Sequence, residues 1–201
     1  MLLHDKLKEY RLILASQSPR RRQLLADAGI QFVLAPRYEC DESFPATMPA
    51  VEVAEYLSGL KADAYPDALG DNDILLTADT VVIADGKVLG KRKDWAEAVA
   101  MLKQLSGREH QVVTGVTLSN ALIRRSFSVL SRVKFRVLTI EEIEYYVDKY
   151  KPFDKAGSYG IQEWIGYVGI EGIEGSFSTG MGLPVQRVYC ELKEFVGLVE
   201  W

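Results

Sequence analysis

The sequence has few of the residues that build metal centres and disulfide frameworks. Its 201 residues include two cysteines, Cys40 and Cys190, and two histidines, His4 and His110, all far apart along the chain. A structural zinc site needs about four such ligands at short spacing, so the sequence excludes one. Two isolated cysteines are typical of a reducing compartment, and we expect both to be buried as small apolar side chains.

Long apolar runs are also missing. No uninterrupted apolar stretch approaches the roughly 18 residues of a membrane span. Near the N-terminus, Asp5, Lys6, Lys8 and Glu9 stand where a signal peptide would be apolar. We therefore expect a cytoplasmic protein that has no membrane partner.

The chain has no excess of positive charge. It contains 24 Lys and Arg against 28 Asp and Glu, so its formal net charge is −4. Proteins that coat nucleic acids are usually basic, and we expect no nucleic-acid partner. A local basic pocket remains compatible with this balance.

Two common nucleotide-binding fingerprints are absent as well. The chain contains neither the GxxxxGK[ST] phosphate-binding loop nor the GxGxxG dinucleotide motif, which disfavours a kinase-like enzyme and a Rossmann redox enzyme. No GxSxG nucleophile motif accompanies His110, so we expect a structural histidine.

The sequence does show a regular alternation of strand and helix signals. Apolar runs predict strands over 11–16, 30–35, 74–84, 87–89, 110–118 and 127–138. The helix-start signals are Ser18-Pro19, Pro49 and the capping-box pairs Asp94/Glu97 and Thr139/Glu142, and Asp85-Gly86 is typical of a two-residue hairpin turn. With 48% apolar residues the chain can fill a core, so we predict a single α/β or α+β domain over residues 1–201.

The last third of the chain is rich in glycine. Half of the 16 glycines fall between Asp154 and Leu183, where Ile, Phe and Tyr are interleaved with them. This composition predicts tight turns and close backbone approaches rather than a flexible linker.

Three consecutive arginines stand in the opening turn of the first predicted helix. A helix N-terminus carries about half a positive charge, so each cation there costs roughly 0.3–1 kcal/mol. Arg20, Arg21 and Arg22 either bend back to solvent or to acidic neighbours, or converge with the backbone N–H groups on an anion. We favour the anion, and phosphate suits such a site best.

Asp79 stands inside the apolar run ILLTADTVVIA. A carboxylate there loses hydration unless it is paired, hydrogen-bonded or bound to a metal. It is either a structural residue at a strand bulge, or a metal ligand or general base. Glu39, Asp41 and Glu42, in a proline-bounded loop, and Lys91 add further charges, and acidic oxygens suit Mg²⁺ or Mn²⁺. The combination favours a nucleotide or phosphoester site.

Three stretches resemble the Maf family: LILASQSPRRRQLL, then ADTVV with KVLGKRKDWAEAVAMLKQLSGREHQVVTGV, then DKAGSYGIQ followed by IEGSFSTGMGLPV. The resemblance runs from about Leu12 to Phe195. It implies an elongated mixed α/β sheet with flanking helices, similar to the inosine triphosphatase group, with two lobes around a central cleft. It also implies a homodimeric nucleoside triphosphate pyrophosphatase that releases a nucleoside monophosphate and pyrophosphate with the help of a divalent metal.

The same resemblance implies roles for seven residues. Asp79, the aspartate of ADTVV, matches the proton acceptor of the family, and Asp79 and Glu42 match positions near the metal. Lys61 and Lys91 match positions near the triphosphate. Positions that set substrate choice correspond to Arg20, Thr80 and Gln162, whose identities resemble the branch that acts on dTTP and UTP.

The chain departs from the family pattern in two places. Arg92 stands where the family usually has proline, and Glu163-Trp164 stands where it has a glycine-rich segment. The second departure adjoins Gln162 and so bears on the strictness of base selection. The alternatives are a pyrophosphatase for another nucleotide, such as methylated GTP or CTP, and a non-enzymatic nucleotide-binding regulator of septum formation.

Overall fold

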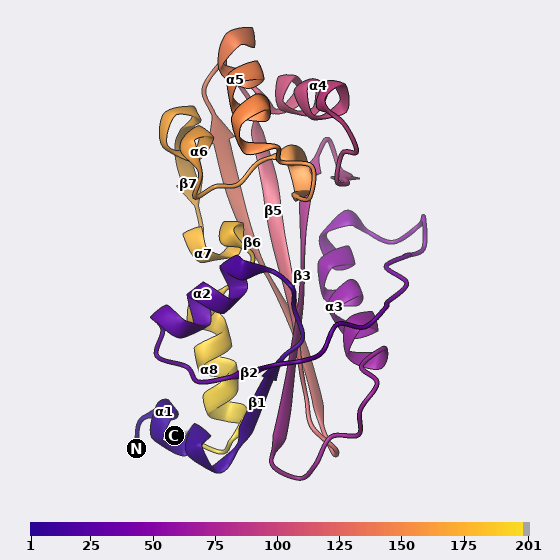
Figure 1. Ribbon diagram of the computed structural model, residues 1–201, viewed down its shortest axis with the longest axis vertical. Helices are drawn as coiled ribbons and strands as arrows, with labels where there is room; N and C mark the ends of the chain where they lie inside the picture. Colours follow the sequence, from indigo (N-terminus) through magenta and orange to yellow (C-terminus); the bar gives the residue numbers. More distant parts are fainter. Residues whose placement is uncertain (199–201) are drawn as a thin grey trace. The chain divides into compact units, whose positions relative to one another are not determined.

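The computed structural model describes residues 1–198, and within them a mixed sheet of seven strands is flanked by helices (Figure 1). Along the sheet the strands follow the order β2-β1-β3-β5-β6-β7, and β4 pairs with β3 beside this path. β1 is parallel to β2 and β3, whereas β4 is antiparallel to β3 and β7 is antiparallel to β6. The predicted mixed α/β architecture is therefore confirmed.

The strands are β1 (Arg11–Leu14), β2 (Val33–Leu34), β3 (Asp73–Ala84), β4 (Lys87–Leu89), β5 (Glu109–Ser119), β6 (Arg124–Phe135) and β7 (Ile170–Glu174). The α-helices are α1 (Leu3–Lys6), α2 (Pro19–Asp27), α3 (Val53–Asp63), α4 (Trp95–Leu105), α5 (Ile140–Tyr150), α6 (Trp164–Gly169), α7 (Phe177–Met181) and α8 (Val185–Phe195). Short 3-10 helices cover Leu7–Glu9, Ala50–Glu52 and Ala156–Ser158. Within residues 1–198, no helix has the length and apolar character needed to cross a membrane.

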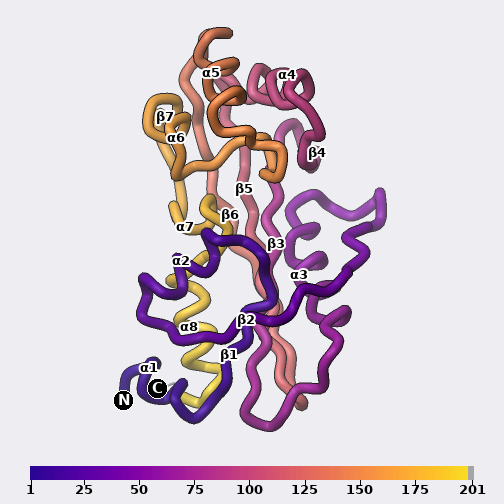
Figure 2. Tube along the Cα trace, in the orientation of Figure 1, coloured from indigo at the N-terminus to yellow at the C-terminus, as the bar shows by residue number. Residues whose placement is uncertain are grey.

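The chain folds as two compact units. The first unit comprises Met1–Asp79, Thr114–Val129 and the segment from Gly182 onward, and the second comprises Thr80–Val113 and Leu130–Met181. Figure 2 lets these segments be followed by their colours. The single domain over 1–201 stays a prediction, and residues 199–201 lie outside the described part of the chain.

The first unit is built on strands whose side chains alternate between two apolar layers. Leu12 and Leu14 of β1 pack in the layer that also contains Leu25 of α2 and apolar residues of α8. Ile13, between them, packs in the other layer with Ala62 of α3. In Figure 1, α2 and α8 accordingly lie on one side of these strands and α3 on the other. Because successive strand residues face opposite sides, a continuous apolar run is needed here.

Two close contacts hold α3 against the strands of the first unit. A Cβ atom on Gly115 of β5 would lie 2.2 Å from the backbone of Ala54, so only glycine fits there. The Thr77 hydroxyl on β3 donates to the Ser58 carbonyl oxygen at 2.7 Å, and Ser58 Oγ lies 2.7 Å from Thr117 Oγ1. These contacts fix the position of α3 along β3 and β5.

The second unit has its own core, formed by α4, α5 and parts of the strands. Leu102 of α4, Tyr146 of α5 and Phe135 of β6 are fully or almost fully buried in it. In this unit α4 and α5 cover the strand segments that follow Asp79 and precede Thr114. The side chains that position the loop after α5 therefore come from this core.

The predicted helix starts and hairpin turn are present. Ser18 and Thr139 cap α2 and α5, and Thr139 forms a complete capping box with Glu142. Asp94 caps α4 through the Glu97 N–H, but the Glu97 carboxylate accepts from Lys93 N instead of completing the box. Asp85 and Gly86 both have positive φ, 51° and 71°, as a type I′ turn requires.

The glycine-rich segment is more regular than its composition predicts. It forms α6, β7 and α7, and the unpredicted α8 follows it. Helix α8 has no side-chain cap at Pro184, which explains why no helix-start signal marks it. The prediction of close backbone approaches was right, since a Cβ atom on Gly166 would lie 1.8 Å from the Ile161 carbonyl oxygen.

The prediction that both cysteines are buried was wrong. Cys40 is only half-buried in the loop before α3, and Cys190 is exposed on α8. Both are free thiols. Cys190 stands on the outer face of a helix whose buried residues are Val188, Glu191 and Leu192, so helical spacing carries it away from the core.

Candidate functional site

The start of α2 lies in the first unit, directly after the turn that follows β1. Ser18 is the N-cap and Pro19 the first helical residue. Ser18 Oγ accepts from the Arg21 N–H at 3.5 Å, and Ser16 Oγ accepts from the Ser18 N–H at 3.2 Å. The turn between β1 and α2 is therefore fixed by two serine side chains, which is how a helix N-terminus can be held ready for an anion.

The three arginines of this turn differ in their contacts. Arg21 Nε donates to the Gly182 carbonyl oxygen at 2.7 Å, and its Nη1 donates to Ser16 Oγ at 3.1 Å. Burial lowers the pKa of the Arg21 guanidinium, while the charge of Asp79 acts in the opposite direction. Arg22 Nη2 bends back to the Gln17 carbonyl oxygen at 3.1 Å.

Arg20 is the arginine of this turn whose guanidinium is available to bind a ligand. Among the described residues, its side chain has no hydrogen-bond or ion-pair partner. Its charge nevertheless acts on Arg21, because it contributes to the lowering of the Arg21 pKa. A cation that is near a helix N-terminus and is not neutralised by a carboxylate suits the binding of an anion.

Lys61, Asp79 and Glu42 form a charged cluster in the first unit. Lys61 Nζ lies 2.6 Å from Asp79 Oδ1 and 3.4 Å from Glu42 Oε1. The Lys61 and Asp79 side chains are only 17% and 12% exposed, whereas Glu42 is 47% exposed. The Asp79 carboxylate, inside an otherwise apolar strand, is therefore paired with a cation, as a buried charge requires.

The backbone around this cluster is held by α3 and the preceding loop. Tyr38 Oη donates to the Lys61 carbonyl oxygen at 2.8 Å, which ties the loop carrying Glu42 to the end of α3. Burial raises the pKa of Tyr38 to about 12, so its hydroxyl keeps the proton that it donates. The cluster thus combines a strand residue, a helix residue and a loop residue at one place.

The carboxylates of this cluster can be compared with the needs of a divalent metal. Within residues 1–198, no three His, Cys, Asp or Glu side chains are grouped so that they could hold a metal ion. Mg²⁺ in nucleotide enzymes is usually held by one or two carboxylates, with phosphate and water as the other ligands. Asp79 and Glu42, which converge on one cation already, fit that mode and not an all-protein cage.

The remaining predicted site residues belong to the second unit. Thr80 follows Asp79 directly on β3 and is half-buried, and Lys91 is exposed in the loop after β4. Gln162 lies just before α6, and its side-chain carbonyl oxygen is buried without a hydrogen-bond partner among the described residues. A buried acceptor that has no protein partner is costly unless a ligand satisfies it.

His110 is buried in the second unit, as expected for a structural histidine. Its Nε2 lies 2.6 Å from the Tyr159 hydroxyl, and its ring also packs on Phe135. Burial lowers the pKa of His110 to about 4, so the ring is neutral at pH 7. His110 therefore anchors the segment that leads to Gln162.

Arg21 and Ser16 are the site residues that sequence reasoning did not single out from their neighbours. The arginine triplet was recognised as a group, but only Arg20 was given a role. The spacing from the Ser18 cap to Arg21 was the available signal, because position 21 lies a full turn into the helix and beside the cap. The acceptor of its second bond, Gly182, is 161 residues away and leaves no local signal.

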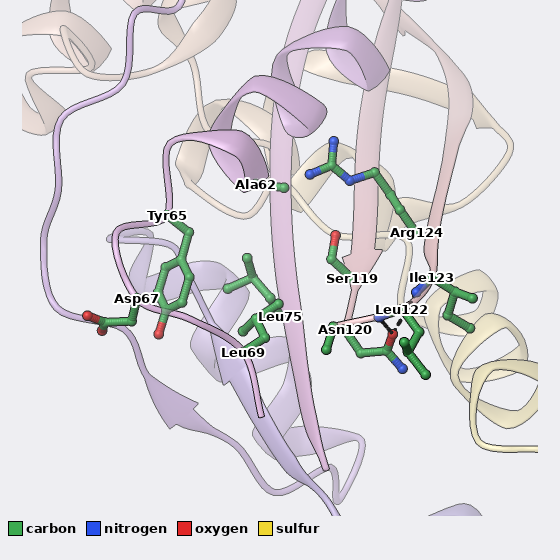
Figure 3. A pocket seen from close by; sticks show the side chains of 11 residues that line it. Ala62, Tyr65, Asp67, Leu69, Leu75, Ser119, Asn120, Leu122, Ile123 and Arg124 are labelled. Carbon is green, nitrogen blue, oxygen red and sulfur yellow. Dashed lines mark hydrogen bonds between the residues drawn. The ribbon is translucent and has the colours of Figure 1, made fainter. Parts of the chain in front are cut away.

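A separate cavity of about 250 Å³ lies in the first unit beside the turn between β5 and β6. Figure 3 shows Tyr65 and Leu69 on one side of it and Asn120 and Leu122 on the other. It is lined by none of the seven predicted site residues. The cavity is thus distinct from the charged cluster around Lys61.

Comparison with known proteins gives consistent matches. A protein from Bacteroides thetaiotaomicron named dTTP/UTP pyrophosphatase is 52% identical over 188 residues, which cover 94% of this chain and 97% of the relative. Proteins of the same name from Porphyromonas gingivalis and Parabacteroides distasonis are 51% and 50% identical, and each match covers 95% of this chain and 97% and 99% of the relative.

The solved structures that match include that of a HAM1 protein from Coxiella burnetii. The match covers 63% of this chain and 73% of that chain at 16% identity, with a TM-score of 0.40.

The family model described as "Maf-like protein" matches residues 11–195, which include every predicted site residue from Arg20 to Gln162. The arginine-rich start of α2, the paired carboxylate in β3 and the glycine-rich segment all lie inside that range. This chain belongs to the Maf family.

Proposed function

We propose that this protein hydrolyses dTTP and UTP to the nucleoside monophosphate and pyrophosphate. The observation that carries the proposal is the cluster in which Lys61 lies between the carboxylates of Asp79 and Glu42. The relatives named dTTP/UTP pyrophosphatase, at 50–52% identity, support the choice of substrates. A cytoplasmic location and a homodimer stay predictions.

Asp79 is the group best suited to activate water. It is a buried carboxylate beside a cation, and a positioned general base typically contributes about 10²–10⁴-fold to a rate. In this role Asp79 orients the attacking water and takes up its proton. The water oxygen then bonds to the α-phosphorus, the bond from the α-phosphorus to the bridging oxygen breaks, and that oxygen leaves with pyrophosphate.

The cations of the first unit would bind the phosphates. Charge in the transition state of phosphoryl transfer spreads over several oxygens, so positioned cations stabilise it. Lys61 can exchange a carboxylate for a phosphate oxygen, and Arg20 adds a cation at the start of α2. Arg21 holds the turn that presents Arg20. We assign Lys91, in the second unit, to the triphosphate as well.

A divalent metal is part of the proposal. Asp79 and Glu42 would hold Mg²⁺ or Mn²⁺, because their oxygens converge and are hard ligands. When bound, such an ion neutralises phosphate charge and so favours departure of pyrophosphate. Lys61, released from the two carboxylates, would then be free to contact the substrate.

Base selection would come from Gln162 and Thr80. The unpartnered carbonyl oxygen of Gln162 can accept the N3–H of uracil or thymine, and its amide N–H can donate to a ring carbonyl. A site with a buried acceptor discriminates against a base that cannot supply the matching donor. Cytosine and adenine present a ring-nitrogen acceptor in place of that N–H donor, so CTP and ATP are expected to be poor substrates.

The test is a substrate panel scored by pyrophosphate release. We expect turnover of dTTP and UTP in the presence of Mg²⁺, little turnover of CTP, GTP or methylated GTP, and loss of activity when EDTA removes the metal. A preference for methylated GTP or CTP would overturn the assignment of Gln162. If the protein binds nucleotides but shows no metal-dependent turnover, the proposal of an enzyme is wrong, and the result favours the alternative of a nucleotide-binding regulator.

A further inference from the structure

The segment Lys155–Glu163 of the second unit, here called the Gln162 loop, has an unusual backbone. Gly157 and Ser158 both adopt positive φ, 68° and 59°, and Ser158 is a fully buried non-glycine residue. Non-glycine residues persist in this conformation only where surrounding contacts enforce it. The contacts that enforce this backbone conformation therefore indicate how the loop is positioned.

One set of contacts centres on Glu163. Glu163 Oε1 lies 3.2 Å from Lys155 Nζ, and Glu163 Oε2 accepts a hydrogen bond from the Tyr146 hydroxyl at 3.2 Å. The Tyr146 oxygen in turn accepts from the Gly160 N–H at 2.9 Å. We call these four residues the Glu163 clasp, because they join the beginning, middle and end of the Gln162 loop to α5.

The clasp is shielded from solvent. The side chains of Lys155 and Glu163 are only 13% and 15% exposed, and Tyr146 is fully buried. Burial, helped by the charge of Glu163, raises the pKa of Tyr146, so its hydroxyl stays protonated and able to donate. Ion pairs and hydrogen bonds with this little exposure hold geometry better than exposed ones.

Gly160 shows how closely the clasp is fitted. A Cβ atom built on Gly160 would lie 2.3 Å from Glu163 Oε1, and its three nearest neighbours would all be atoms of the Glu163 side chain. The carboxylate thus occupies the space that a side chain at position 160 would need. A glutamate at 163 and a glycine at 160 depend on each other.

The position of Gln162 in this loop makes the clasp relevant to the base. A glutamine amide has a donor side and an acceptor side, and a half-turn exchanges them. Uracil and thymine present an N3–H donor beside a carbonyl acceptor, whereas cytosine presents an N3 acceptor beside an amino donor. One orientation of Gln162 therefore matches uracil, and the reversed orientation matches cytosine.

We propose that Glu163 is a positioning residue that makes the enzyme prefer uracil and thymine over cytosine, by holding the Gln162 loop so that the Gln162 amide keeps one orientation. This inference rests on the proposed function. Glu163 acts through Gln162 and is not expected to touch the nucleotide. The departure from the family's glycine-rich pattern at position 163 is then a device for base selection and not a loss of it.

The experiment measures kcat and KM for UTP and CTP in the wild type and in Glu163→Gly and Tyr146→Phe. We expect the ratio of kcat/KM for UTP to that for CTP to fall about tenfold in both variants, which is the worth of one well-placed hydrogen bond. The fall should come mainly from a higher KM for UTP, with kcat changed much less. Glu163→Gln, which keeps the bond from Tyr146, should restore most of the ratio.

Gly160 provides a reciprocal test. Gly160→Ala alone should lower the same ratio, because its Cβ atom expels the Glu163 carboxylate. In a chain that already carries Glu163→Gly, adding Gly160→Ala should change the ratio by less than twofold, since the obstructing side chain is gone. Independent, additive effects of the two substitutions would count against the clasp.

Thr139→Ala is the matched control in the same unit. It removes the cap of α5 without touching the Gln162 loop, so it should lower Tm and leave the UTP-to-CTP ratio unchanged. If Glu163→Gly and Tyr146→Phe lower Tm in the same way and also leave the ratio unchanged, Glu163 is only structural and the inference is overturned. A wild type that releases no pyrophosphate from UTP or dTTP overturns the proposed function and this inference together.

Discussion

The charged cluster of the first unit and the Gln162 loop of the second are held in opposite ways. Lys61, Asp79 and Glu42 attract one another as full charges, and Glu42 remains half-exposed. The Gln162 loop is fixed by buried contacts, which include the His110–Tyr159 pair and the Glu163 clasp. Ion pairs with a half-exposed member can exchange partners, whereas buried hydrogen bonds are costly to break.

This difference agrees with the two tasks that we propose for these regions. Charge neutralisation tolerates small movements, because Coulomb attraction falls off gradually with distance. Base recognition depends on hydrogen bonds that weaken steeply when they are misaligned. We therefore expect substitutions in the cluster to act on kcat and substitutions around the loop to act on stability and selectivity.

Replacing Asp79 with asparagine gives the largest expected effect. Asp79→Asn keeps the size of the side chain but removes the base, so kcat for dTTP and UTP should fall about 10²–10⁴-fold while the circular dichroism spectrum stays unchanged. Near-normal turnover would show that the cluster does not perform the chemistry.

Asp73→Asn is the control for this variant. Asp73 is a buried carboxylate on the same strand, and it accepts from Arg11 Nε and Nη2 at 2.7 Å each. This substitution should lower Tm but preserve kcat, because the pair is structural. If both variants lose the same share of kcat, the loss follows from removing a buried charge of β3 and not from removing the proposed base.

The pH dependence of stability tests whether the buried His110 contributes to the stability of the second unit. The pKa of His110 is about 4 in the folded chain and about 6.5 when unfolded, so only the unfolded chain takes up this proton at intermediate pH. Stability is full above pH 6.5 and falls as the pH drops towards 4, by up to about 3 kcal/mol. Urea denaturation over this range should show a shallower fall for His110→Gln. If the unfolding free energies of the wild type and His110→Gln fall in parallel with pH, His110 is not the cause of the pH dependence.

Gly115→Ala should disturb the cluster through the backbone. The added methyl group meets the backbone of Ala54 and forces α3, with Lys61, away from β3. The expected cost is about 1–3 kcal/mol in unfolding free energy, together with reduced turnover. Gly59→Ala is the control: it has open space on α3, so it should raise Tm. A fully active Gly115→Ala would show that the position of α3 is not critical.

Thr139→Ala gives the smallest expected effect. The variant loses the N-cap of α5 and should be less stable by about 1 kcal/mol in thermal or urea unfolding. Its kcat/KM for UTP should match that of the wild type. A change in selectivity would mean that the loop responds to general loosening of the second unit.

The sequence was informative where local rules operate. Ser18, Asp94 and Thr139 marked helix starts because a cap depends on residues three positions apart. Asp85-Gly86 marked its turn because few residues accept positive φ twice in succession. Asp79 stood out because an apolar strand makes a carboxylate conspicuous.

The rest of the site depends on distant pairs that leave no local pattern. The bond from Arg21 to Gly182 and the approach of Gly115 to Ala54 join segments far apart in the chain. The exposure of Cys190 depends on which face of α8 packs against the core. Helix α8 itself could not be predicted from a capping residue, because it has no side-chain cap. The Glu163 departure was visible in the sequence, but its partners Tyr146 and Lys155 were not.

The bond from Arg21 to Gly182 also has a consequence for the order in which the protein folds. The first unit begins at the N-terminus but is completed only by the segment from Gly182 onward, which brings α8 onto Leu14 and Leu25. During synthesis, α8 can cover these apolar residues only after the segment from Gly182 onward has left the ribosome. Contacts of such high sequence separation slow folding, so the second unit can become compact while the turn between β1 and α2 is still unformed.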